Sequence, residues 1–156
     1  MRSFPSARIV PMSRVHIPAC AEIVSSSDPW KRLGERLDFV SLLSGERPDL
    51  KSYVCVVDKK AVGFIVFTPD PVFARGGYLR AIGVAPSLRR LGIGNRLLAY
   101  AEKTTARRSS NFYLCVSSFN RRAQVFYKKL GYLRVGKVPD LLVQGSSEYI
   151  YWKRLR

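Results

Sequence analysis

The spacing of apolar residues along the chain predicts strands and helices in mixed order. Runs rich in β-branched and aromatic residues, bounded by turn residues, indicate strands, whereas apolar residues three and four positions apart indicate helices. By these criteria, strands are expected over residues 7–12, 53–57, 61–67, 78–84, 111–116, 132–138 and 149–153. Helices are expected over residues 18–24, 30–43, 93–106 and 120–130. This order predicts an α+β fold around one central sheet.

Each predicted helix has one apolar face that would pack on the sheet. These faces are Ile17, Ala21 and Val24; Leu33, Leu37, Val40 and Leu43; Ile93, Leu97, Leu98 and Ala101; and Ala123, Phe126, Tyr127 and Leu130. Pro18 suits the first turn of a helix, and Gly131 suits the residue after a helix end. The turn Asp58-Lys59-Lys60 would join two strands into a hairpin without the usual glycine.

Residues 77–103 contain the most informative segment, in which a predicted strand is followed by an arginine- and glycine-rich loop and an amphipathic helix. Glycine lets a backbone approach a ligand closely, and the unpaired N–H groups at a helix start attract anions. Arginine adds charge and forked donors suited to phosphate. The loop Arg89-Arg90-Leu91-Gly92-Ile93-Gly94-Asn95-Arg96 therefore predicts a pyrophosphate site.

Two common phosphate-binding motifs do not fit this loop. A dinucleotide fingerprint has a third glycine where this chain has Leu97, and an acidic residue further on where residues 109–112 are Ser-Ser-Asn-Phe. A P-loop requires Gly-Lys-Ser or Gly-Lys-Thr, which the sequence lacks.

Three segments together resemble the GNAT N-acetyltransferase family. The spacing Arg-x-x-Gly-x-Gly at residues 89–94 is similar to the family's acetyl-coenzyme A loop, and residues 82–86 are similar to its fourth strand and exit turn. Asn120 and residues 126–132 resemble its Asn…Tyr-x-x-x-Gly-Phe/Tyr element. The resemblance covers nearly the whole chain. It implies one domain over residues 6–156, with a mixed sheet of about seven strands, about four flanking helices and a splay between the fourth and fifth strands.

The resemblance also implies acetyl-coenzyme A as the acyl donor and places it in that splay. The pantetheine arm would pair with backbone groups of Ile82, Gly83 and Val84, and the Ile82 N–H would face the thioester carbonyl oxygen. The amides of residues 92–96 would hold the pyrophosphate. Gly83 in mid-strand suits a bulge that opens the splay; alternatively, it only relieves crowding.

Tyr127 matches the family's general acid. A phenol with a pKa near 10 is protonated at neutral pH and can give its proton to a leaving thiolate. The alternative is a tyrosine that only fills the core. Asn120 would cap the last helix and, by the resemblance, contact the pantetheine arm. Trp30 is expected in the core rather than as a wall of the acceptor pocket.

The general base is not identified by the resemblance. Relatives that act on protein N-termini carry a glutamate where this chain has Cys115, and a buried thiol is a poor base because burial raises its pKa. Glu148 acting through water, Glu35 and Asp38 are alternatives, although surface solubility is the expected role of each.

Composition and charge limit where the protein is expected in the cell and which partners it is expected to bind. The chain has 156 residues, and no apolar run approaches the roughly 18 residues of a membrane span. The N-terminus lacks a signal-peptide core, and Cys20, Cys55 and Cys115 form no Cys-x-x-Cys pair, which predicts free thiols, no metal site and a cytoplasmic location. The net charge is +16, but the basic residues are dispersed, which does not favour nucleic acid as a partner. The single histidine, His16, is expected at the surface.

The sequence therefore predicts an N-acetyltransferase that moves an acetyl group from acetyl-coenzyme A directly to an amine. The acceptor is left open between a protein N-terminus and a small molecule, and a homodimer is left open as well. The alternative function is a non-catalytic acyl-coenzyme A-binding or basic ribosome- or nucleic-acid-associated module on the same fold. Both classes would bind the cofactor, but only the enzyme would release thiol in the presence of an amine.

Overall fold

The computed structural model describes residues 6–34, 37–70, 72–73 and 75–156. Its strands are β1 (Arg8–Pro11), β2 (Lys51–Val57), β3 (Lys60–Thr68), β4 (Gly77–Val84), β5 (Asn111–Ser117), β6 (Leu133–Pro139) and β7 (Ser147–Arg154). Its α-helices are α1 (Ile17–Ser25), α2 (Trp30–Leu33), α3 (Phe39–Leu43), α4 (Ile93–Ala106) and α5 (Arg121–Lys129), and short 3-10 turns lie at Arg14–His16 and Pro86–Leu88. The strands form one seven-stranded sheet in the order β1-β2-β3-β4-β5-β7-β6, which confirms the predicted α+β class.

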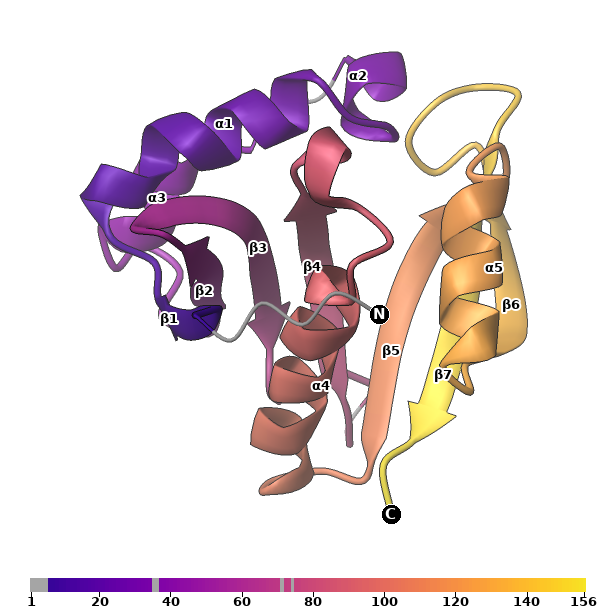
Figure 1. The fold of residues 1–156 in the computed structure, drawn as a ribbon. Helices are drawn as coiled ribbons and strands as arrows, with labels where there is room; N and C mark the ends of the chain where they lie inside the picture. The colour runs from indigo at the N-terminus through magenta and orange to yellow at the C-terminus, as the bar shows by residue number, and fades with distance from the viewer. Residues whose placement is uncertain (1–5, 35–36, 71, 74) are drawn as a thin grey trace.

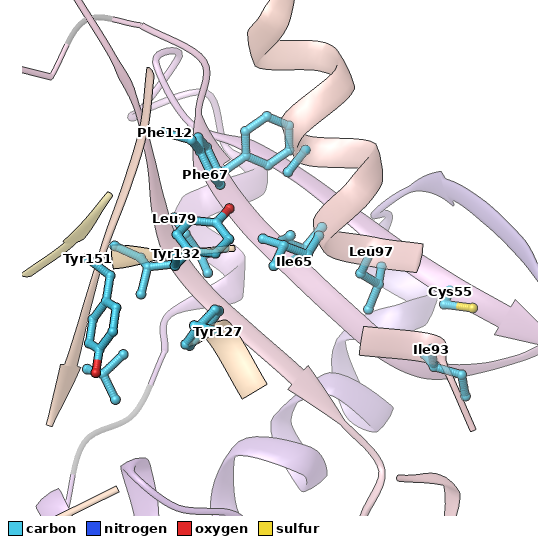
Figure 2. Packing of buried hydrophobic residues seen from close by; sticks show 14 of the residues in the cluster. Cys55, Ile65, Phe67, Leu79, Ile93, Leu97, Phe112, Tyr127, Tyr132 and Tyr151 are labelled. Carbon is cyan, nitrogen blue, oxygen red and sulfur yellow. The ribbon is translucent and has the colours of Figure 1, made fainter. Parts of the chain in front are cut away.

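Helices cover both faces of this sheet (Figure 1). One core cluster joins α1, α2 and α3 to the sheet and includes Trp30 and Phe64. The other joins α4 and α5 to the opposite face and includes Ile65, Leu97 and Tyr127 (Figure 2). Phe64 and Ile65 are adjacent on β3, are both fully buried and belong to different clusters. Because successive strand residues point to opposite faces, a strand covered on both sides is apolar throughout.

The parallel strands β4 and β5 pair only over their first residues. Their register ends at Leu79↔Leu114, and Figure 1 shows the two strands opening beyond this point. Adjacent residues of β3 pair with Leu79 and Ala81, which leaves Arg80 between them as a bulge. A bulge bends its strand, so β4 turns away from β5 at the point where their pairing stops. The predicted splay between the fourth and fifth strands is confirmed.

The prediction of a bulge at Gly83 is wrong, since Gly83 pairs in register with Phe64. A Cβ at this position would lie 2.6 Å from Cε1 of Phe64 and 2.9 Å from Cγ2 of Ile23. Carbon atoms that are not bonded to each other do not approach so closely. Gly83 therefore relieves crowding between β4, β3 and α1, which is the alternative that the sequence left open.

The predicted helix over residues 30–43 is in fact two helices. Gly34, at φ 66°, ends α2 in the left-handed conformation that glycine tolerates. Asp38 then begins α3 by accepting a hydrogen bond from the Ser41 N–H at 3.0 Å. The second helix start changes which residues are buried. Phe39 is 3% exposed, whereas Val40, which was expected inside, is 59% exposed.

The face of α1 also differs from the prediction. Its buried residues are Cys20, Ile23 and Val24, whereas Ala21 is exposed. His16, expected at the surface, is half-buried, and its Nδ1 accepts a hydrogen bond from the Ser13 N–H at 3.0 Å.

Other local predictions are confirmed. The expected face of α4 is buried at all four positions, Ile93, Leu97, Leu98 and Ala101. The hairpin between β2 and β3 forms without glycine, because Asp58 and Lys59 adopt φ values of 48° and 66°. These positive values match the turn that suits the strand twist. Gly131 follows α5 at φ 91°.

Candidate functional site

A cavity of ≈ 490 Å³ lies where β4 and β5 diverge. Its walls come from β4, the loop before α4, the first turn of α4, β5 and α5, with α2 at one side. Of the predicted site residues, those at 82–84 and 92–95, together with Arg89, Arg90, Asn120 and Tyr127, line this cavity. Among the described lining residues there is neither Leu91 nor Arg96.

The edge of β4 that faces this cavity has backbone groups with which no other described strand pairs. Ala85 N–H donates to the Val62 carbonyl of β3 at 2.8 Å. Because backbone groups of an antiparallel strand alternate in direction, Gly83 also faces β3, whereas Ile82 and Val84 direct their N–H and C=O groups away from it. Within the described sheet, β5 no longer pairs with β4 at these residues. Two residues of the predicted three therefore offer backbone groups to an extended ligand.

The first turn of α4 presents amides to the same cavity. Gly92 is the N-cap residue at φ 83°, and the first helical hydrogen bond runs from the Arg96 N–H to the Gly92 carbonyl at 3.1 Å. The amides of residues 93–95 precede this bond, so they have no acceptor within the helix. The Arg96 amide is used in this bond, and its guanidinium donates to the Ala7 carbonyl at 2.9 Å, so the amides left open to a ligand are those of residues 93–95.

The two loop arginines play different parts. Arg89 Nη2 donates to Ser27 Oγ at 2.8 Å, which ties the loop to the segment between α1 and α2. Its Nε donates to the Val84 carbonyl at 3.4 Å. Burial lowers the pKa of Arg89, and the nearby charge of Arg122 acts in the same direction. Arg90 is exposed, in the left-handed conformation at φ 65°. Arg89 thus helps to hold the cavity wall together, and Arg90 places a charge at its rim.

Tyr127 and Asn120 lie on the opposite wall, on α5 and at its start. Asn120 Oδ1 accepts a hydrogen bond from the Ala123 N–H at 3.2 Å, which caps α5 as expected. Tyr127 is 6% exposed, and its ring packs against Tyr132 with a centroid distance of 5.7 Å (Figure 2). Burial raises the pKa of Tyr127. Its hydroxyl therefore keeps its proton at neutral pH and can act as a proton donor.

Cys115 lines the cavity from β5. Burial raises the pKa of its thiol, although the Tyr78 hydroxyl hydrogen-bonds to it and acts in the opposite direction. A protonated thiol is a poor base. Tyr78, on β4, is a neighbour that the sequence pattern did not single out, because a tyrosine in a strand is ordinarily a packing residue.

Glu148 is not a surface residue, and that prediction is wrong. It is 4% exposed, lines the cavity from β7, and accepts a hydrogen bond from Ser117 Oγ at 2.5 Å. Asp38 instead caps α3, and Glu35 lies outside the described residues. The position of an acidic residue directly before the apolar run Tyr149–Trp152 was the sequence signal that could have pointed to Glu148.

Trp30 lies in the core, as expected, and also lines the cavity. It is 7% exposed, and its ring lies 5.8 Å from that of Phe64 in the core. It also lines the cavity, on the side formed by α2.

Among the described residues, no group of three or more His, Cys, Asp or Glu side chains could hold a metal ion. The three cysteines carry free thiols, as expected. None of the helices in the described parts of the chain has both the length and the apolar character needed to cross a bilayer.

Comparison with known proteins places these features in a family. A family model described as the Acetyltransferase (GNAT) family matches residues 17–132. An N-alpha-acetyltransferase of Sulfurisphaera tokodaii is 29% identical over 109 residues, which are 63% of this chain and 65% of that protein. The chain thus spans less than two thirds of the length of this relative.

Solved structures show the same fold. Ard1 from Thermoplasma volcanium has a TM-score of 0.80 at 23% identity, covering 96% of this chain and 97% of that one. An aminoglycoside 6'-N-acetyltransferase complexed with coenzyme A has a TM-score of 0.72 at 22% identity, covering 96% and 97%. The family match extends from the first residue of α1 to the residue before β6. The chain belongs to the GNAT family of acetyltransferases.

Proposed function

We propose that this protein is an acetyl-coenzyme A-dependent N-acetyltransferase that moves the acetyl group directly to an amine. The observation that carries the proposal is the β4 edge at Ile82 and Val84, which directs backbone groups into a ≈ 490 Å³ cavity beside the first amides of α4. An extended, amide-bearing ligand can add to such an edge like a strand. A diphosphate can bind at such a helix start. Coenzyme A contains both groups in one molecule and carries the acetyl group as a reactive thioester.

Three residues of this chain would have different roles in acyl transfer. The Ile82 N–H would donate to the thioester carbonyl oxygen, because a fixed backbone donor stabilises the negative charge that develops there. Tyr127 would give its proton to the departing thiolate, since it faces the cavity and its raised pKa keeps it protonated. Asn120 would hold α5, and with it Tyr127, through its helix cap.

The charges of the cavity favour an acceptor with a single amine, such as a protein N-terminus. Among the described residues that line the cavity, four are arginines, Arg80, Arg89, Arg90 and Arg122, and two are acids, Asp28 and Glu148. A polycationic acceptor such as a polyamine or an aminoglycoside would be repelled by this excess. Leu141 and Leu142, which also line the cavity, are 52% and 48% exposed and offer an apolar contact to the residue that carries the amine. The printed name of the Sulfurisphaera relative, an N-alpha-acetyltransferase, supports this acceptor class.

An acceptor screen with acetyl-coenzyme A tests the proposal. Short peptides with free α-amines, a polyamine and an aminoglycoside would be compared by thiol release and by the mass of the acetylated product. We expect turnover with the peptides and little with the polycations. Coenzyme A binding without thiol release for any amine would favour the non-catalytic alternative, and turnover with the polycations alone would overturn the proposed acceptor class.

A further inference from the structure

Glu148 brings a buried carboxylate to the part of the cavity where β5 and β7 meet. The two strands pair Ser117 with Glu148 and Cys115 with Ile150. Residues directly opposite each other in an antiparallel pair share a face of the sheet, and so do residues two apart on one strand. Cys115, Ser117 and Glu148 therefore lie on one face, and the longer Glu148 side chain can reach the space beside the Cys115 thiol.

Glu102 shows how a structural carboxylate is held in this fold. Its oxygens accept hydrogen bonds from Lys153 Nζ at 3.1 Å and from the Tyr132 hydroxyl at 2.7 Å. Glu102 is not among the described residues that line the cavity, whereas Glu148 lines it together with Ile82 and Tyr127. Glu148 thus faces the space that the thioester and the amine would share, and Glu102 does not.

We propose that Glu148 takes the proton of the acceptor amine, an inference that rests on the proposed transferase function. An α-amino group has a pKa near 8 and is largely protonated at neutral pH, so it must lose a proton before its nitrogen can attack. That proton passes to the Glu148 carboxylate. The freed lone pair forms the C–N bond at the thioester carbonyl carbon, and the C–S bond then breaks.

The remaining protons balance within the same set of groups. The departing thiolate takes the hydroxyl proton of Tyr127. The nitrogen loses its second proton to the resulting phenolate, which restores Tyr127. Glu148 returns its proton to water, so the products are the amide, the thiol of coenzyme A and one proton.

Two titratable groups near Glu148 cannot accept the amine proton in its place. Among the described residues, the titratable and charged groups that line the cavity with Glu148 are Tyr78, Arg80, Cys115, Arg122 and Tyr127, together with Asp28, Arg89 and Arg90. On the neighbouring strand β6, Val138 pairs with Glu148, and Lys137 is the adjacent residue. The charge of Glu148 contributes to the raised pKa values of Tyr78 and Cys115. Both groups therefore stay protonated at neutral pH and cannot accept the proton.

Glu148→Gln tests this role, because it removes the charge and keeps both the size of the side chain and an acceptor for Ser117. Steady-state rates with a peptide acceptor that has a free α-amine and is turned over by the wild type would be measured between about pH 6 and pH 10 for the wild type and this variant. Glu22→Gln, which removes an exposed carboxylate on α1, is the matched control. We expect kcat/KM of Glu148→Gln to fall about 10²-fold or more at pH 7. The deficit should shrink above about pH 8, where the amine is already neutral.

The outcome distinguishes a proton acceptor from a structural residue. Coenzyme A affinity, measured by calorimetry, should be unchanged in Glu148→Gln, and Glu22→Gln should match the wild type in every assay. A deficit of equal size at all pH values, or a rate close to that of the wild type, overturns the proposal. If Glu148→Gln does not fold, Glu148→Asp replaces it: this variant keeps the carboxylate, so a slower rate with the wild-type pH profile supports the role, and a profile that follows amine ionisation overturns it. A wild type that binds coenzyme A but acetylates no amine overturns the proposed function itself.

Discussion

Substitutions of Gly92 can separate the effect of a negative charge at the start of α4 from the effect of an added side chain there. Gly92 is the N-cap residue at φ 83°, and a Cβ added to it would meet no described atom within 4 Å. The main cost of a side chain is therefore the left-handed backbone, which Asn and Asp adopt more readily than other residues. Gly92→Asp and Gly92→Asn should both fold, and they differ by one negative charge at the same place.

The expected size of the effect follows from that charge. In a coenzyme A complex, the new carboxylate would lie against the diphosphate and would also compete for the amides of residues 93–95. Two unit charges about 5 Å apart, at an effective dielectric constant of about 20, repel by roughly 3 kcal/mol. This corresponds to about a hundredfold increase in Kd. Gly92→Asn carries no charge, so it should bind coenzyme A within about tenfold of the wild type.

Isothermal titration calorimetry of coenzyme A with the three proteins would measure the difference. Thermal melts followed by circular dichroism would show that both variants fold. The gap between the Asp and Asn variants should shrink as salt is raised, because salt screens exposed charges. Equal Kd values for the two variants at low salt would refute the placement of the diphosphate at the start of α4.

The other predictions concern the acid and the packing of β4. Tyr127→Phe removes the proton donor but keeps the ring in the core, so turnover should fall about 10²-fold or more while coenzyme A affinity, measured by calorimetry, changes little. Cys115→Ala should keep turnover within a few-fold and lower the free energy of unfolding by about 1 kcal/mol; an inactive Cys115→Ala beside an active Tyr127→Phe would reverse both assignments. Gly83→Ala should lower the free energy of unfolding by about 1–3 kcal/mol, because its methyl carbon would lie 2.6 Å from Phe64. An unchanged urea midpoint for this variant would contradict the crowding argument.

Short-range signals account for the elements that the sequence determined by itself. The apolar spacing of Ile93, Leu97 and Leu98 predicts the buried face of α4, because residues three and four apart share one side of any helix. Gly131 similarly ends α5, since its positive φ is a property of that residue alone. The glycine loop before α4 lies beside the cavity for the same reason: strand, loop and helix are consecutive in the chain.

Tertiary structure decided the features that depend on distant partners. Apolar spacing continues from α2 into α3, yet Gly34 and the Asp38 cap divide the predicted helix, and only the packed structure shows that Phe39 rather than Val40 is buried. The bulge that opens the splay is at Arg80, where the register between β3 and β4 shifts, and not at the glycine that looks permissive in the sequence. The intrinsic preference of a residue for helix or strand is a weak constraint, and the burial of an apolar face in the tertiary structure outweighs it.

Glu148 is the clearest case of what the tertiary structure alone decided. In the sequence it is an acidic residue near the C-terminus, which is ordinarily solvated. In the folded chain it is 4% exposed and bonded to Ser117, which is 31 positions away along the sequence. Its burial exists only because β7 inserts between β5 and β6. Strand order of this kind is set by the free energy of the whole sheet, and no local pattern of residues encodes it.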